Sequence, residues 1–273
     1  DSSILWENAT CGIHNQAVLW QRILRLAHCG IPYRIHILSD LERENMPDYR
    51  CYLFPDLFQL TPHRVDLLER KVLRDGRMAI FGPGTGIVDD TGNIGPYPVS
   101  ELLDVEMEMD EATSQRRVIL EGTDPLVGRL PSNYIYGDSV AYGPIIKPAK
   151  GAVAAAGARH LGHANTWWNI NRPGLFMIER PDCRIAWSIA MPFPPALLRE
   201  LAREGGCHVW CERDDVVLAS DTVAAVHTAS PGTTTLRFPD ARSVWNLQTG
   251  EHVGDQLTEV SIEVDPPQTT LFY

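Results

Sequence analysis

The chain has 273 residues, 44% of them hydrophobic, and a formal net charge of −11. The acidic balance argues against nucleic acid and anionic membranes as partners, and no apolar run approaches the roughly 20 residues of a membrane span. The length allows one large domain or two moderate ones with a packed core.

The first residues indicate a piece of a longer protein. The chain begins at Asp1 and almost at once enters an amphipathic helix expected over residues 15–29, which Gly30 ends. A parallel sheet would normally begin with a strand, and here the first expected strand is 33–38. Targeting signals cannot be judged from such a piece, and a cytoplasmic location is the favoured expectation.

Residues 50–86 read as strand, turn, helix, strand and glycine loop, which is one parallel βαβ unit. The apolar run 50–54 is typical of a strand covered on both faces. Thr61 is a suitable N-cap for a helix that starts at Pro62. A second buried strand over 78–81 leads into residues 82–86, a Gly-Pro-Gly-Thr-Gly turn at the edge where open α/β sheets place their ligands.

The middle of the chain continues with short elements. Ser100 is expected to cap a helix over 101–103, and a helix with a proline start follows Pro195. Strands are expected over 105–109, 117–120, 134–148, 152–156, 175–179, 185–189, 207–211 and 216–218.

The pattern changes near residue 220. From Thr222 the chain holds five short strand-like runs, TVAAVHTA, TTTLRF, SVWNLQ, EVSIEV and QTTLFY, separated by Pro-Gly, Pro-Asp, Thr-Gly and Pro-Pro turns. Such spacing is typical of an antiparallel all-β module. We therefore expect an α/β domain over residues 1–220 and a small all-β domain over 221–273.

Several stretches carry a resemblance to a known family. They include GIPYRIHILSDL, the run from Tyr49 to Asn93 with its FGPGTG turn, VSELLDVEMEM, the run from Leu197 to Pro239, and VWNLQTGEHVG. Their order resembles the C-terminal part of bacterial β-galactosidases of the trimerisation-domain type, glycoside hydrolase family 42 and its relatives. The resemblance implies a flavodoxin-like, class I glutamine-amidotransferase-like domain, with helices on both faces of a parallel sheet, followed by a small β-sandwich.

The resemblance also implies a function. In such proteins a catalytic TIM barrel comes first, and 273 residues leave no room for one beside the elements already assigned. The leading interpretation is a non-catalytic accessory or oligomerisation fragment of a β-galactosidase-like glycoside hydrolase. Its expected partners are further copies of itself, as in the family's trimers, and a TIM-barrel domain absent from this chain.

No catalytic residue is assigned. Active amidotransferases place Cys at the strand-to-helix elbow in a Gly-x-Cys-x-Gly setting, whereas this chain has Gly84 and Thr85 in the corresponding turn. The glycines suit a tight turn, and Thr85 has no adjacent base that the sequence identifies. Gly84 and Thr85 are therefore kept only as candidate ligand-binding residues, and an amidotransferase-like or other hydrolase with an unrecognised site remains an alternative.

A second alternative is a carbohydrate-binding module. Trp167 and Trp168, with Arg172 nearby, form a candidate platform for a sugar ring, although a subunit interface is the favoured interpretation of these residues. His160 and His163 are interpreted as surface-loop residues and Asp214 and Asp215, like Asp89 and Asp90, as exposed turns. No metal or cofactor is expected, because the six cysteines are irregularly spaced and are interpreted as mostly buried thiols.

Overall fold

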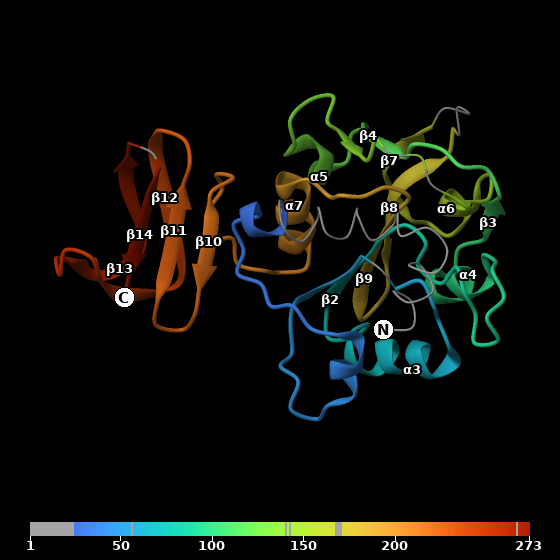
Figure 1. Cartoon of the computed structure of the whole chain (residues 1–273), viewed down its shortest axis with the longest axis horizontal. Coiled ribbons are helices and arrows are strands. Elements are labelled where there is room, and N and C mark those ends of the chain that lie inside the picture. Colours follow the sequence, from blue (N-terminus) through green and yellow to red (C-terminus); the bar gives the residue numbers. More distant parts are fainter. Residues whose placement is uncertain (1–24, 56, 140, 142, 167–170, 266) are drawn as a thin grey trace. The chain divides into compact units, whose positions relative to one another are not determined.

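The computed structural model describes residues 25–273 except 56, 140, 142, 167–170 and 266 (Figure 1). The described residues form two compact units. The first contains 36–193 and 200–206, and the second contains 25–35, 194–199 and 207–273. Within the described part of the chain no helix is both long and apolar enough to cross a membrane.

The first unit is built on a mixed seven-stranded sheet with the order β1-β2-β9-β8-β7-β4-β5. Parallel pairing joins only β1, β2 and β9, and every other neighbouring pair is antiparallel. The bounds are β1 Cys51–Phe54, β2 Arg77–Phe81, β4 Arg117–Leu120, β5 Ile135–Gly137, β7 Arg159–Asn165, β8 Pro173–Glu179 and β9 Cys183–Ser188.

The α/β class is confirmed, but the expected all-parallel sheet is wrong. The physical reason lies in the connections. Between the last residue of β8, Glu179, and the first of β9, Cys183, there are only three residues, whereas a parallel crossover needs about a dozen or more. The chain must therefore turn back as a hairpin, and it does so again between β7 and β8.

The βαβ unit at 50–86 is confirmed. Helix α3 (Pro62–Lys71) begins as expected, with the Thr61 hydroxyl oxygen accepting from the Arg64 N–H at 3.2 Å. Strand β2 is buried along its whole length and pairs in parallel with β1. The core of the first unit, to which this βαβ unit belongs, includes Phe81, Phe176 and Trp187, all fully buried.

The remaining elements of the first unit are short. Strands β3 (Met107–Asp110) and β6 (Ile145–Pro148) form a separate antiparallel pair. Besides α3, the described part of this unit contains the helices α4 (Tyr97–Leu103), α5 (Pro125–Gly128) and α6 (Ala152–Ala155) and the 3-10 helix η3 (Leu38–Glu42). A further helix, α7 (Pro195–Glu204), lies where the sequence predicted it, and its residues are divided between the two units.

The second unit contains small antiparallel sheets. Strands β10 (Val216–Ala219), β11 (Ala224–Thr228) and β14 (Gln268–Phe272) form one sheet, and β12 (Gly232–Trp245) pairs with β13 (His252–Val264) in a long bulged hairpin. All five strands contribute side chains to one hydrophobic cluster. Strand β10, assigned from the sequence to the α/β region, pairs with β11.

Several local predictions are wrong. Residues 33–38 form no strand, and Ile35 and Ile37 are largely exposed there. Of the strand expected over 152–156, residues 152–155 are helical instead, since alanine favours a helix. Helix α4 begins at Tyr97, so the Ser100 hydroxyl is not a cap and donates to the Pro96 carbonyl instead. Residues 207–211 form no strand, and SVWNLQ contains the end of β12 rather than a strand of its own.

The helix expected over 15–29 lies mostly outside the described residues, and only the short 3-10 helix η2 (Leu26–His28) is seen.

Candidate functional site

The glycine loop that follows β2 is closed by its own contacts. Gly84 and Gly86 have positive φ angles of 77° and 64°, which only glycine adopts without strain. At Gly82 an added Cβ would lie 2.7 Å from the Met191 sulfur and 2.8 Å from the Pro55 carbonyl oxygen. The loop therefore needs glycine for its backbone path and its close packing.

Thr85 is fully buried in this loop, and its hydroxyl donates to the Gly82 carbonyl at 2.8 Å. The Gly86 N–H donates to the Leu57 carbonyl, and the Ile87 N–H donates to the Gly84 carbonyl. The Thr85 hydroxyl is thus directed into the protein. A nucleophile would have to point toward solvent, where it can reach a substrate. Ligand binding at Gly84 and Thr85 stays a prediction.

The other predicted binding residues do not join this loop. Arg172 lies just before β8, where its guanidinium is 3.7 Å from a carboxylate oxygen of Glu108. Trp167 and Trp168 lie outside the described residues, so the stacking platform expected there stays a prediction.

Two interpretations of polar residues need correction. His160 and His163 lie on strand β7 and not in a loop, and His163 Nδ1 is 2.7 Å from the Glu121 carboxylate. Asp215 is buried rather than exposed, and it contacts Arg213 at 3.3 Å and the Thr234 hydroxyl.

The exposed turn at Asp89 is confirmed. Its carboxylate accepts from the Thr91 N–H and hydroxyl and from the Asn93 N–H, and the Thr91 and Asn93 contacts lower the pKa of Asp89. Among the described residues no group of three or more His, Cys, Asp or Glu side chains is placed to hold a metal ion.

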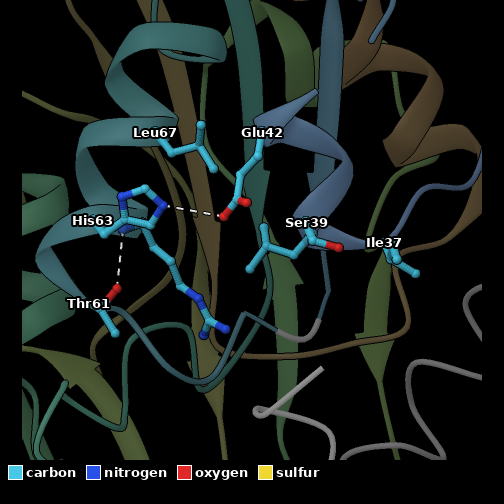
Figure 2. A pocket seen from close by; sticks show the side chains of 8 residues that line it. Ile37, Ser39, Glu42, Thr61, His63 and Leu67 are labelled. Carbon is cyan, nitrogen blue, oxygen red and sulfur yellow. Dashed lines mark hydrogen bonds and ion pairs between the residues drawn. The ribbon is translucent and has the colours of Figure 1, made fainter. Parts of the chain in front are cut away.

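A half-open pocket of about 420 Å³ lies between η3 and the start of α3 (Figure 2). Its polar lining includes Ser39, Glu42, Thr61, His63 and Arg64, and its apolar lining comes from Ile37, Leu38 and Leu67. The volume falls within the range of small-ligand sites. No pattern in the sequence indicates this pocket, because the approach of η3 to α3 is a tertiary contact.

The polar groups of this pocket are mostly paired with each other. His63 Nε2 lies 3.3 Å from Glu42 Oε1, and both side chains are more than half exposed. The Arg64 guanidinium donates to the Gln59 backbone and side-chain oxygens, and burial lowers its pKa. In Figure 2 the Ser39 hydroxyl points away from His63. The three side chains are therefore not arranged as a Ser-His-Glu triad.

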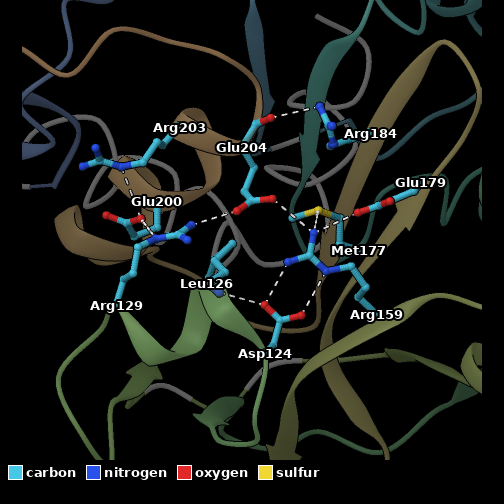
Figure 3. Close-up of polar contacts among 10 residues, drawn as sticks. All are labelled: Asp124, Leu126, Arg129, Arg159, Met177, Glu179, Arg184, Glu200, Arg203 and Glu204. Atoms are coloured by element: carbon cyan, nitrogen blue, oxygen red, sulfur yellow. Dashed lines mark hydrogen bonds and ion pairs between the residues drawn. The ribbon is translucent and has the colours of Figure 1, made fainter.

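A second polar cluster, the arginine network, is defined here as Asp124, Arg129, Arg159, Glu179, Glu200 and Glu204 (Figure 3). Arg159 binds both oxygens of Asp124, at 2.8 and 2.9 Å, and also contacts Glu179 at 2.9 Å and Glu204 at 3.1 Å. Arg129 bridges Glu200 and Glu204. The network joins β7, β8, α5 and α7, so its geometry is that of a set of ion pairs that holds these elements together.

The pKa shifts in the network agree with this role. The hydrogen bonds from Arg159 lower the pKa of Asp124. Desolvation acts against ionisation of Glu204, but the bonds from Arg129 and Arg159 prevail and lower its pKa. Both carboxyls are therefore held ionised, whereas a general acid needs a raised pKa.

The described cysteines that are buried are not activated. Burial raises the pKa of the thiols of Cys29, Cys183 and Cys211, although nearby Arg199 and Arg180 act in the opposite direction. A reactive cysteine needs a lowered pKa and access to solvent. These three thiols are therefore suited to packing rather than to nucleophilic attack.

Several solved structures have a similar fold. A β-galactosidase from Bacillus circulans sp. alkalophilus superimposes with a TM-score of 0.56 at 17% identity, over 82% of this chain and 33% of its own length. This chain shares its fold with part of a β-galactosidase. The GH42 β-galactosidase Gan42B from G. stearothermophilus, as its E323A catalytic mutant, gives 0.57 at 13% identity, over 97% of this chain and 36% of that chain.

A second structure of Gan42B gives a TM-score of 0.56 at 14% identity with the same coverage. The chain therefore spans about a third of the length of the solved structures that it matches. No protein-family model and no curated protein matches it in sequence.

Proposed function

We propose that this chain is a non-catalytic accessory and oligomerisation part of a β-galactosidase-like glycoside hydrolase. Its first unit corresponds in this proposal to the amidotransferase-like, flavodoxin-like domain of the trimerisation type. Its partners are further copies of itself, assembled as a trimer, and a TIM-barrel domain that carries the chemistry.

The observation that carries this proposal is the coverage of the match. Almost the whole chain, 97%, superimposes on 36% of a GH42 β-galactosidase. A part that covers so little of an enzyme fits an accessory role better than a complete catalytic one. Such a likeness in fold carries no activity by itself, because function resides in particular sites.

The pKa shifts of the carboxyl groups support the proposal that this chain is non-catalytic. Glycosidases use two carboxyl groups, one of them an acid with a raised pKa. In the described chain every carboxyl with a shifted pKa is shifted downward; these are Asp89, Asp110, Asp124, Glu204 and Asp255. Such groups are poor proton donors near neutral pH.

The test combines mass and turnover. Light scattering on the chain over a concentration series is expected to give three times the 30.5 kDa monomer mass, and the chain is expected not to hydrolyse nitrophenyl β-galactoside. A monomer at every concentration would refute self-assembly through these residues. Turnover that persists through repeated purification would refute the non-catalytic assignment.

A further inference from the structure

The outer face of the second unit carries an aromatic cluster near the end of β12. Val244 and Phe272 are almost completely buried in the hydrophobic cluster of this unit. The β12–β13 register shifts between Val244 and Trp245, and the residues that follow these two buried side chains, Trp245 and Tyr273, are exposed instead. Trp245 is 43% exposed and Tyr273 is 58% exposed.

The strand register places three rings in a row. Trp245 is the register partner of His252 on β13. On its other side, Trp245 and Tyr273 exchange two backbone hydrogen bonds of 2.9 Å, so they lie directly opposite each other. Residues directly opposite in an antiparallel pair share a face. Trp245 therefore lies between His252 and Tyr273, and its ring centroid is 4.5 Å from that of His252.

A carboxylate lies at the edge of this row. Asp255 Oδ1 accepts from the Ser243 hydroxyl at 2.5 Å and faces His252 Nε2 at 3.2 Å. These contacts lower the pKa of Asp255, so it stays a charged acceptor. Within the described chain Oδ2 receives no hydrogen bond, which leaves it available to a ligand.

We propose that this surface, defined as Ser243, Trp245, His252, Asp255 and Tyr273, binds a neutral sugar ring. A pyranose has one face of C–H groups, which packs on the exposed Trp245 ring, and hydroxyl groups at its edge, one of which donates to Asp255 Oδ2. An exposed aromatic ring with a hydrogen-bond acceptor beside it matches this combination of groups. The site is separate from Trp167 and Trp168, and the proposal does not depend on the proposed function.

The charges of this surface favour a sugar over a second copy of the chain. Asp255 and the exposed Glu251 lie close to the rings, and the chain carries a net charge of −11. A two-fold contact of this face with itself would bring equivalent carboxylates together, which is unfavourable without intervening cations. A neutral sugar brings no charge and supplies donors for the acceptor.

The test uses the full chain and methyl β-galactopyranoside, methyl β-glucopyranoside and methyl α-mannopyranoside as probes. Titration is followed by the indole N–H signals in a proton-nitrogen correlation spectrum, and the Trp245 signal is assigned by its loss in Trp245→Phe. We expect this signal to shift with at least one probe, with a Kd on the order of 1–10 mM for so open a site.

Three variants make the result specific. Trp245→Ala is expected to weaken binding at least tenfold, and Asp255→Asn, which keeps the side-chain shape, about threefold to tenfold. In Trp245→Ala, binding is read from backbone amides of His252 and Tyr273. The matched control is Tyr97→Ala, because Tyr97 is an exposed aromatic residue of α4, 82% exposed, and belongs to the other unit; it is expected to bind as the wild type does.

Circular dichroism establishes that each variant is folded. The proposal is overturned if no probe shifts the Trp245 signal at 100 mM, or if Trp245→Ala and Tyr97→Ala bind equally well. It is also overturned if Trp245→Ala lowers the mass of the assembly without any sugar-dependent shift in the wild type, since the surface would then be an interface between copies.

Discussion

Replacing Arg159 by Met tests whether the arginine network stabilises the first unit. The substitution removes both bonds to Asp124, whose side chain is only 12% exposed and retains one bond from the Leu126 N–H. Breaking a buried ion pair costs about 3–5 kcal/mol. Here the cost is smaller, because Arg159 is 25% exposed and Glu179 is 55% exposed, so that solvent screens the interaction. We expect a loss of about 2–3 kcal/mol in the free energy of unfolding.

The effect should depend on pH in a defined direction. The folded-state pKa values of Asp124 and Glu204 are lowered, so their contribution is fully present above the unfolded values of about 3.9 and 4.3. It is lost as pH falls through the lowered folded values. Urea unfolding followed by circular dichroism should therefore show a constant advantage of the wild type over Arg159→Met from pH 7 to about pH 5, and an advantage that declines as pH falls below about 4.

Arg129→Met is the matched control. Arg129 is 39% exposed, and after its removal Glu200 retains Arg203 at 3.3 Å while Glu204 retains Arg159. Its loss is expected to cost only about 1 kcal/mol. The reasoning is refuted if Arg159→Met costs less than about 0.5 kcal/mol at pH 7, or if its cost is the same at pH 7 and pH 3.

Three further predictions concern the core and the glycine loop of the first unit. Gly86→Ala should lower the free energy of unfolding, measured in thermal melts, by about 2–4 kcal/mol. The reason is that φ is +64° and the new Cβ would lie 2.6 Å from Leu60 Cδ1 and 2.9 Å from the Val99 nitrogen. The control Gly92→Ala, with φ +89° and open space around it, should cost about 1 kcal/mol. Tyr136→Phe removes a 2.7 Å hydrogen bond to Ser188, whose hydroxyl keeps Ala190 as a partner. Urea unfolding should therefore show a free energy of unfolding about 1 kcal/mol lower, and a loss above 3 kcal/mol would contradict this account. Thr85→Cys places a thiol in a fully buried position, so mass spectrometry after iodoacetamide treatment should show no label beyond the wild-type number, and one additional rapid label would show that the loop opens to solvent.

The sequence predicted the first unit best where local signals agree with tertiary structure. The Thr61 cap, Pro62, the apolar periodicity of α3 and the glycine turn all indicate the same βαβ unit, and the structure confirms it. The prediction of a strand over 33–38 was wrong. The alternation of Ile35 and Ile37 resembles a strand, but a strand also requires a pairing partner. The antiparallel direction of β8 and β9 was missed although the short connection between them excludes a parallel crossover. The pairing of β4 with β7 was missed because it joins residues about 40 positions apart.

The candidate sites were harder to predict because they depend on contacts between distant residues. Nothing in the sequence brings Glu42 to His63, or Arg159 to Asp124, since each pair is separated by more than twenty residues. The exposure of Trp245 could not be predicted from alternation, because the β12–β13 register shifts between Val244 and Trp245. The sequence could not show that Tyr273 and His252 flank it, since that follows from the pairing of three strands.

The glycine loop connects the fold to the proposed function. In an α/β sheet the end of β2 is the position where a nucleophile would be presented, yet here the Thr85 hydroxyl donates inward to the Gly82 carbonyl. Replacing the residue type alone would not create a nucleophile, because Gly82 and Gly86 leave no space for side chains around the loop. Under the proposed function this scaffold would contribute through its surfaces. Trp245 and Asp255 are exposed groups of the second unit that a ligand can reach.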